Sequence, residues 1–351
     1  MRNFTATTKQ TSSMRDRTFS RREIIKQGGL ALTALALPFP LTSFTNFNKM
    51  TDDNKYEVII IGGSYSGLSA GMGLGRALRK TLIIDSGKPC NSQTPYSHNF
   101  ITQDGKSPKE ISMLAKKQVE NYNTINFYNG LAITGTKVEN GFEIKTEKGD
   151  IFFAKKLIFA TGVKDIMPNI NGFAECWGIS VIHCPYCHGY EYKNDKTGIL
   201  ANGDMAFEIG KLISNWTKDL TIFTNGTSTL TTEQLEKLRK HNIKINEFEI
   251  DYFNHKNGHI ESIVFKNGNT EKVAALYARP AFEQHCNIPQ QLNCEMTEQH
   301  HIKIDAFQKT TAHGIFASGD NTTMMRSVSY AIATGGIAGA IANRELIEET
   351  F

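Results

Sequence analysis

Tyr56-Glu57-Val58-Ile59-Ile60-Ile61-Gly62-Gly63-Ser64-Tyr65-Ser66-Gly67 gives this 351-residue chain its architecture. The β-branched run predicts a buried parallel strand, and the glycines after it predict a tight turn into a helix that reaches about Arg79. A second strand, Thr81-Leu82-Ile83-Ile84-Asp85, ends in an acid 23 positions after Gly62. Strand, glycine turn, helix, strand and acid together indicate a βαβ dinucleotide-binding unit.

The turn departs from the usual G-x-G-x-x-G pattern at one position, where Ser64 replaces the second glycine. That position lets the backbone approach a pyrophosphate closely, and serine is the smallest change that still permits the approach. The helix after the turn supplies free N–H groups and a positive dipole end for phosphates.

The rest of the chain continues the α/β pattern. Alternating apolar and polar residues with glycine breaks predict a β-meander over 130–153, and Lys156-Leu157-Ile158-Phe159-Ala160-Thr161-Gly162 returns as a core strand. Near the C-terminus, Gly314-Ile315-Phe316-Ala317-Ser318-Gly319-Asp320 predicts another strand ending in an acid. An Ala/Gly-rich helix, residues 328–346, follows it and can pack closely on a sheet.

The middle of the chain contains Cys184-Pro185-Tyr186-Cys187-His188 and then a second, eroded βαβ pattern. Ala201 replaces the first glycine of that turn, which covers residues 201–206. The following strand ends in Phe223-Thr224-Asn225-Gly226, with neither an acid for a ribose nor a basic cluster for a 2′-phosphate. The residues therefore support the fold but not, by themselves, NAD(P)H binding.

The CxxC by itself fits several chemistries. It is compatible with a redox dithiol, with a glutaredoxin-like protein, or with a structural zinc site that also uses Cys286 and Cys294. Those two cysteines could instead pair with each other in an oxidising compartment. The position of the CxxC between two dinucleotide-type folds favours a dithiol that exchanges electrons with a flavin.

Taken together, residues 56–351 resemble the low-molecular-weight thioredoxin reductases and their FAD-dependent dithiol oxidase relatives. The resemblance implies two Rossmann-like domains, with an FAD domain split around an inserted pyridine-nucleotide-type domain. Its parts are residues 55–166, an insert at 167–272 that carries the CxxC, and residues 273–351. It implies FAD contacts by these residues: Gly62, Gly63, Ser64, Ser66, Gly67, Asp85, Ser86, Ala160, Thr161, Gly162, Gly319 and Asp320.

The resemblance also implies the roles of the two cysteines. Cys187 would lie over the flavin as the charge-transfer thiolate, and Cys184 would exchange with substrate. His188 is the candidate proton shuttle, with His183 second, and packing or capping is the alternative for His188. Cys90 and His98 fall in segments expected near the flavin, Cys90 more as a buried structural cysteine than as a second redox thiol. The tract His255, His259, His285, His300 and His301 is expected at the surface.

Two departures favour the dithiol oxidase branch. Thioredoxin reductases usually have an aspartate where this chain has His188, and the NADPH-binding turn is largely missing. The predicted function is therefore oxidation of a dithiol. An NAD(P)H-dependent disulfide reductase is the alternative, and a non-catalytic flavin- or metal-binding protein is a lesser one. The expected substrate is a small dithiol or a protein disulfide, and the expected assembly is a homodimer.

The N-terminal residues resemble a targeting segment. Residues 1–41 carry seven basic and two acidic side chains, a net charge of +5, so the remainder of this +4 chain is nearly neutral. Nothing in that remainder suggests nucleic-acid or membrane binding. Ser20-Arg21-Arg22 precedes a modest apolar run too short to span a bilayer comfortably. We expect residues 1–45 to be a twin-arginine signal and linker, and the protein to be exported and periplasmic, without stable membrane association after processing.

Overall fold

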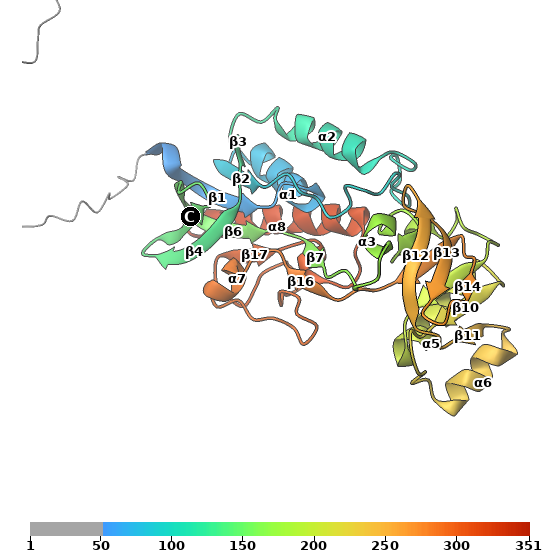
Figure 1. The fold of residues 1–351 in the computed structure, drawn as a ribbon. Helices are drawn as coiled ribbons and strands as arrows, with labels where there is room; N and C mark the ends of the chain where they lie inside the picture. Colours follow the sequence, from blue (N-terminus) through green and yellow to red (C-terminus); the bar gives the residue numbers. More distant parts are fainter. Residues whose placement is uncertain (1–51) are drawn as a thin grey trace, which may run out of the picture. The chain divides into compact units, whose positions relative to one another are not determined.

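The structure is a computed structural model that describes residues 52–351, and its largest element is a seven-stranded sheet (Figure 1). The strand order is β3-β2-β1-β6-β5-β4, and β17 also pairs with β6. The strands are β1 (Lys55–Ile61), β2 (Thr81–Asp85), β3 (Ile125–Asn129), β4 (Ala132–Val138), β5 (Gly141–Thr146), β6 (Ile151–Phe159) and β17 (Ile315–Ala317). The predicted signal segment, residues 1–45, lies outside the described residues.

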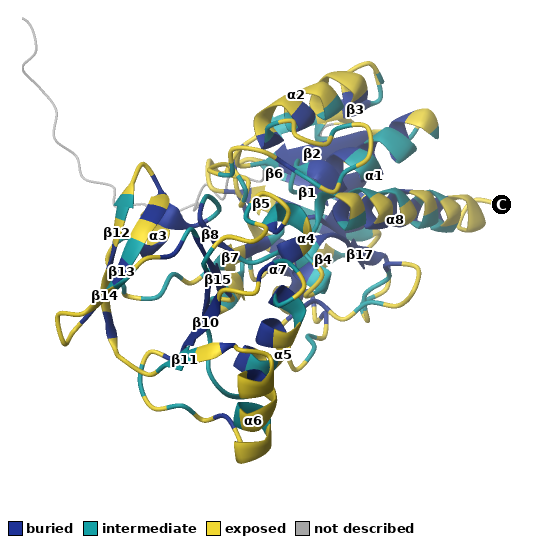
Figure 2. Cartoon of the chain, turned by 90° about the vertical axis from the view of Figure 1, so that its right-hand side faces the viewer, coloured by how far each residue is buried: buried dark blue, intermediate teal, exposed yellow. Residues whose placement is uncertain are grey.

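Strand β6 joins the two halves of this sheet. Strand β6 pairs with β1 and β17 in parallel. On its other side, the start of β6 forms with β5 and β4 the antiparallel meander that the sequence predicts. Four helices belong to this domain: α1 (Tyr65–Arg76), α2 (Pro108–Val119), α7 (Ile288–Gln291) and α8 (Val328–Glu348). In Figure 2 the central strands are buried, while α2 turns exposed residues outward.

The inserted domain has a second, five-stranded parallel sheet with the order β11-β10-β9-β15-β8. Its strands are β8 (Val181–Ile182), β9 (Thr197–Leu200), β10 (Leu220–Phe223), β11 (Lys244–Asn246) and β15 (Ala275–Ala278). An antiparallel sheet contains β12 (Ile250–Lys256), β13 (His259–Phe265) and β14 (Thr270–Glu271). The helices are α3 (Phe173–Cys176), α4 (Pro185–His188), α5 (Gly203–Ile213) and α6 (Thr232–Lys240).

Two Rossmann-type sheets confirm the predicted fold class. The predicted end of the insert, residue 272, falls short of β15, which pairs with β8 and β9 inside the second sheet. The chain enters and leaves the insert through a two-stranded antiparallel ladder of β7 (Val163–Asp165) and β16 (Phe282–Gln284), side by side in Figure 1.

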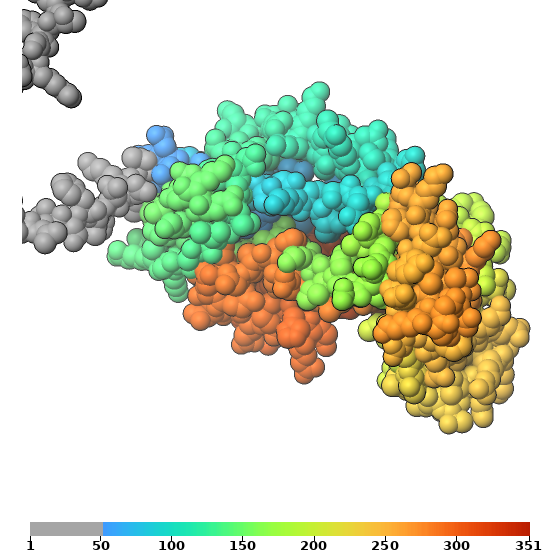
Figure 3. Space-filling view, viewed as in Figure 1, coloured from blue at the N-terminus to red at the C-terminus, as the bar shows by residue number. Residues whose placement is uncertain are grey.

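Residues 281–315 pack against the meander, and they lie beside it in Figure 3. Ile288 and Leu292 enter the same core as Ile144, and the side chain of Gln291 accepts a hydrogen bond from the backbone N–H of Gly135 at 3.0 Å. Residues far apart in the sequence thereby close one face of the sheet.

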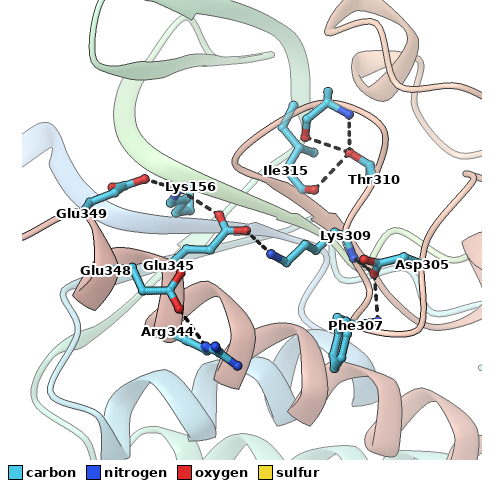
Figure 4. Close-up of polar contacts among 11 residues, drawn as sticks. Lys156, Asp305, Phe307, Lys309, Thr310, Ile315, Arg344, Glu345, Glu348 and Glu349 are labelled. Atoms are coloured by element: carbon cyan, nitrogen blue, oxygen red, sulfur yellow. Dashed lines mark hydrogen bonds and ion pairs between the residues drawn. The ribbon is translucent and has the colours of Figure 1, made fainter.

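The end of α8 is fixed to the sheet by a buried lysine (Figure 4). Lys156 on β6 is 1% exposed and bonds Glu345 at 2.9 Å and Glu349. Lys309 reaches the other oxygen of Glu345 at 2.8 Å. Burial alone would raise the pKa of Glu345, but the bonds from Lys309 and Lys156 outweigh it and lower the pKa. The stability that Glu345 contributes is therefore present at neutral pH and is lost as the pH falls through its lowered pKa.

We predict that Lys156→Met destabilises the protein by about 2 kcal/mol, because it removes a buried cation from the largely buried carboxylate of Glu345. The matched control is Lys309→Met, which removes a half-exposed lysine from the same carboxylate and should cost less than about 1 kcal/mol. Urea unfolding followed by circular dichroism measures both. An equal loss of unfolding free energy in the two variants would contradict the role assigned to the buried Lys156.

Candidate active site

The turn between β1 and α1 is closed by backbone contacts that only glycine allows. Gly62 has φ +105°, and a Cβ there would lie 2.2 Å from the carbonyl oxygen of Ala160. A Cβ on Gly67 would lie 1.8 Å from the carbonyl oxygen of Gly62. The turn therefore lies directly against the end of β6, which ends beside β1 in the parallel sheet. Ser64 occupies the N-cap of α1, and its hydroxyl makes no capping bond to any described residue.

Asp85 closes the other side of the turn. One oxygen of its carboxylate accepts a hydrogen bond from the N–H of Gly63 at 3.1 Å, and a Cβ on Gly63 would lie 2.8 Å from the Asp85 side chain. The acid at the end of β2 thus lies at the glycine turn, as a βαβ nucleotide unit requires.

The C-terminal part of the chain fixes α1 from its far side. Ser66 and Ser318 are buried, with their hydroxyl oxygens 2.7 Å apart. The N–H of Gly319 donates to Thr334 on α8 at 3.1 Å, and a Cβ on Gly335 would lie 2.1 Å from the carbonyl oxygen of Ser66. Gly319 and Asp320 therefore meet the start of α1, although about 250 residues separate them in the sequence.

These elements line a cavity of about 450 Å³. The cavity brings together residues from both Rossmann-type domains. Of the predicted site residues, Cys184 and Gly67 are not on its wall. The predicted residues on the wall are Gly62, Gly63, Ser64, Ser66, Asp85, Ser86, Ala160, Thr161, Gly162, Cys187, His188, Gly319 and Asp320.

Cys184 and Cys187 form a disulfide across the short helix α4, with their Cα atoms 5.3 Å apart. Cys187 lines the cavity and Cys184 does not. Next to them, the ring of Tyr186 meets Trp216 edge-on at 5.5 Å, and a Cβ on Gly189 would lie 2.9 Å from Trp216. The indole thus limits where α4 can lie, and the disulfide presents one sulfur to the cavity.

His188 lies on the cavity wall beside Cys187, and neither of its ring nitrogens has a hydrogen-bond partner among residues 52–351. Burial lowers its pKa, and the nearby Glu191 opposes that shift. His183, the second candidate, has its pKa lowered to about 3 by burial and by Arg326. A buried neutral imidazole with free nitrogens can accept a proton, and His188 is adjacent to the disulfide.

Sequence reasoning missed a buried ion pair on the cavity wall. Arg326 binds Asp165 through both terminal nitrogens at 2.6 and 3.0 Å, and the indole N–H of Trp177 donates to Asp165 at 3.2 Å. Burial raises the pKa of Asp320, although the nearby Arg326 opposes the shift. Arg326 of the first domain, Asp165 on β7 and Trp177 of the insert are in contact here. No sequence motif predicted these contacts.

One histidine expectation needs correction, because His301 is buried, with its ring centroid 4.7 Å from that of Phe282 on β16. His285 is exposed, as predicted, and it also lines the cavity. His98 lies on the cavity wall where it was expected.

The remaining cysteines are thiols in the described part of the chain. Cys286 and Cys294 are free, which contradicts a disulfide between them. Cys90 opens onto the cavity and is not the buried structural cysteine expected.

The second glycine turn is filled by the protein itself. The side-chain oxygen of Asn202 accepts bonds from the N–H groups of Gly203 and Thr229 at 2.9 and 2.8 Å, and its amide donates to the carbonyl of Thr227 at 2.9 Å. A Cβ on Gly203 would lie 2.8 Å from the Thr229 hydroxyl. Glu247 accepts a bond from the N–H of Ser228 at 2.6 Å. The loop after β10 therefore lies over the start of α5.

Within residues 52–351, no group of three or more histidine, cysteine, aspartate or glutamate side chains is arranged to hold a metal ion. None of the helices there has the length and apolar character needed to span a bilayer.

Comparisons with known proteins agree with this geometry. The sequence model of the family described as "Pyridine nucleotide-disulphide oxidoreductase" matches residues 56–335. Thioredoxin reductase tcpT from Claviceps purpurea is 31% identical over 315 residues, covering 86% of this chain and 97% of that protein. Thioredoxin reductase sirT from Leptosphaeria maculans is 30% identical, covering 82% and 93%. The crystal structure of an oxidoreductase from Agrobacterium tumefaciens has a TM-score of 0.79 and 35% identity, covering 84% and 99%.

We predict that Gly67→Ala abolishes retention of the FAD that the turn is expected to hold, because the new methyl group meets the Gly62 carbonyl and displaces the turn. Gly73→Ala on the same helix is the matched control, since a Cβ there meets no described atom within 4 Å. That control should keep its flavin and gain up to about 1 kcal/mol of stability.

The ratio of flavin to protein absorbance after purification measures the outcome, and circular dichroism reports whether each variant folds. A folded Gly67→Ala protein with full flavin content would show that the turn is not the FAD site.

Proposed function

The chain belongs to the pyridine nucleotide-disulphide oxidoreductase family, whose members are FAD-binding oxidoreductases acting on sulfur groups, and from this premise we propose that it oxidises a dithiol substrate. One observation carries the proposal: Cys187 of the Cys184–Cys187 disulfide lines the same cavity as the glycine turn, and Cys184 does not. We therefore assign Cys187, which faces the cofactor cavity, to the flavin side and Cys184 to exchange with substrate.

The residues present fit FAD. A cradle in which Gly62, Gly63 and Gly67 leave no room for a Cβ keeps backbone N–H groups open at the start of α1, where a pyrophosphate binds. Asp85 offers its second carboxylate oxygen for a ribose, and Gly319 and Asp320 stand on the opposite wall. When bound, FAD supplies a two-electron acceptor.

The protein's part is thiol–disulfide exchange. A substrate thiolate attacks the sulfur of Cys184, the Cys184–Cys187 bond breaks, and Cys187 leaves as a thiolate. The second substrate thiol then attacks the substrate sulfur of the mixed disulfide, which closes the substrate disulfide and releases Cys184. Of the two substrate protons, one ends on the Cys184 sulfur and the other on His188. FAD, when bound, would accept the two electrons, and oxygen or a quinone would be the terminal acceptor.

The filled second turn supports this direction of electron flow. A dinucleotide needs open N–H groups at the start of α5. The backbone N–H of Gly203 is not open, because it already donates to the side chain of Asn202. The loop over the turn is also held by Glu247, whose negative charge is unfavourable for a 2′-phosphate. Without a pyridine nucleotide as electron donor, the dithiol is the remaining source of electrons.

The second candidate is an NAD(P)H-dependent disulfide reductase. It is favoured by the five-stranded parallel sheet of the insert and by relatives named thioredoxin reductase. A homodimer remains part of either proposal.

We predict that dithiothreitol bleaches the flavin spectrum of the purified protein under anaerobic conditions, whereas NADH and NADPH do not. Cys187→Ser should keep its flavin but lose bleaching, because no disulfide can form. Cys294→Ala, which changes a buried cysteine outside the cavity, should bleach as the wild type does. Bleaching by NADPH would favour the reductase, and a flavin-loaded protein that no donor bleaches would favour a non-catalytic role.

Export remains a proposal about residues 1–45, which lie outside the described residues. We predict that the double substitution Arg21→Lys/Arg22→Lys retains the protein in the cytoplasm of a bacterial host, because the twin-arginine transporter reads that pair. Arg15→Lys/Arg17→Lys keeps the same charge and should be exported normally. Cell fractionation and immunoblotting measure both, and periplasmic recovery of the twin-lysine variant would contradict the proposal.

A further inference from the structure

Trp177 lies where the first domain, the linker and the insert come into contact, shortly before Cys184 in the chain. It belongs to the insert, between α3 and β8. Its ring stacks on that of Phe173 in the core of the insert, with the ring centroids 5.8 Å apart. Trp177 is only 5% exposed, and it lies on the wall of the cavity that Cys187 also lines.

The first domain binds the backbone of Trp177. The side-chain amide of Gln93, in the segment after β2, donates to the carbonyl oxygen of Trp177 at 2.5 Å. A Cβ on the next residue, Gly178, would lie 3.0 Å from the hydroxyl oxygen of Thr94 and 3.2 Å from the side chain of Gln93. Gly178 has φ +77°, a conformation that glycine adopts without strain. The segment after β2 is therefore in close contact with the insert at Trp177 and Gly178.

The linker binds the indole of Trp177. The indole N–H donates to the carboxylate of Asp165 on β7 at 3.2 Å. The Asp165 side chain is 5% exposed, and the guanidinium of Arg326 binds both of its oxygens, at 2.6 and 3.0 Å. Because a buried carboxylate that loses a donor is costly, the indole and the guanidinium together fix Trp177 relative to the first domain.

From Trp177 the chain leads directly to the disulfide. Trp177 forms a β-bridge with Val181, which is the first residue of β8. His183 and Cys184 follow that two-residue strand at once. The ring of His183 lies against that of Trp177, with the centroids 5.9 Å apart and the planes inclined by 33°. A displacement of Trp177 would therefore displace the segment that carries the disulfide.

We propose that Trp177 is a positioning residue that holds Cys187 at the flavin site. Gln93 and Asp165 fix Trp177 in that position. The inference deepens the dithiol oxidation proposed above and rests on it. Exchange with substrate needs only access to the sulfur of Cys184, whereas reduction of the flavin needs Cys187 in contact with the cofactor. Loosening the contacts of Trp177 should therefore slow flavin reduction and leave reduction of the disulfide unchanged.

Two variants loosen these contacts without removing much volume. Trp177→Phe keeps a ring that can stack on Phe173, but it loses the N–H that Asp165 accepts. Gln93→Glu has the same shape as the wild type and places an oxygen against the carbonyl oxygen of Trp177. Gln291→Ala is the matched control, because it removes side-chain hydrogen bonds that lie within the first domain alone.

The first measurement reads the contact without turnover. In flavin-loaded Cys184→Ser protein, Cys187 cannot form the disulfide, and its thiolate in contact with oxidised flavin gives a long-wavelength absorbance band. The band is measured at alkaline pH, where the thiolate is fully formed. We expect Trp177→Phe and Gln93→Glu to reduce it to roughly half or less, since the contact depends on a displacement of about 1 Å. Gln291→Ala should leave the band unchanged.

The second measurement separates the two chemical steps in protein that retains both cysteines. Stopped-flow anaerobic bleaching by saturating dithiothreitol should be about tenfold slower in Trp177→Phe and in Gln93→Glu. Reduction of the Cys184–Cys187 disulfide by dithiothreitol is followed separately, as the gain of alkylatable thiols in protein freed of flavin. That rate should match the wild type in both variants.

Flavin content and circular dichroism show whether each variant folds. An unchanged band in both variants, or no band in Cys184→Ser itself, would overturn the inference. Equal slowing of bleaching and of disulfide reduction would also overturn it, because a general loss of structure slows both steps. Absence of bleaching in the wild type would instead overturn the proposed function, while the absorbance band would still test the position that Trp177 gives to Cys187.

Discussion

Backbone contact around α1 is the constraint on which the rest of this structure depends. The helix lies so close to the turn before it and to α8 that three glycines have no room for a Cβ: Gly67 against Gly62, Gly335 against Ser66, and Gly339 against Ala70. The same closeness brings the ends of β1, β6 and β17 to one place. The cavity exists because side chains are absent where these backbones meet, and the start of α1 opens into it.

A second set of contacts holds the disulfide at that cavity. Within residues 52–351, the chain passes between the two Rossmann-type domains at β7 and β16, which pair with each other. Asp165, at the end of β7, binds Arg326 of the first domain and the indole of Trp177 in the insert. Because a buried carboxylate without a partner is costly, these bonds favour one arrangement of linker and insert. The short helix α4 then presents Cys187 rather than Cys184 to the cavity.

Much of this could be predicted from local sequence. The βαβ pattern at residues 56–85, the meander and the CxxC are short-range signals, because strand periodicity and glycine turns act over a few residues. The departure from the glycine pattern at Ala201 was also informative, because it predicted a weakened second turn. In the structure, Asn202 and Thr229 fill that turn. The end of the insert was placed too early because β15 is a four-residue strand whose pairing with β9 has no local signal. His301 was misjudged for a similar reason, since its burial against Phe282 comes from the fold of β16.

The sequence by itself determined the fold class, the flavin-type turn and the redox pair, because each depends on residues close together in the chain. Only the tertiary structure decided which sulfur faces the cavity, that Arg326 and Asp165 line it, and that His98 meets Glu191. These contacts join residues about 90 to 160 positions apart. Their formation depends on the packing of two domains, and no periodicity or spacing in the chain records that packing.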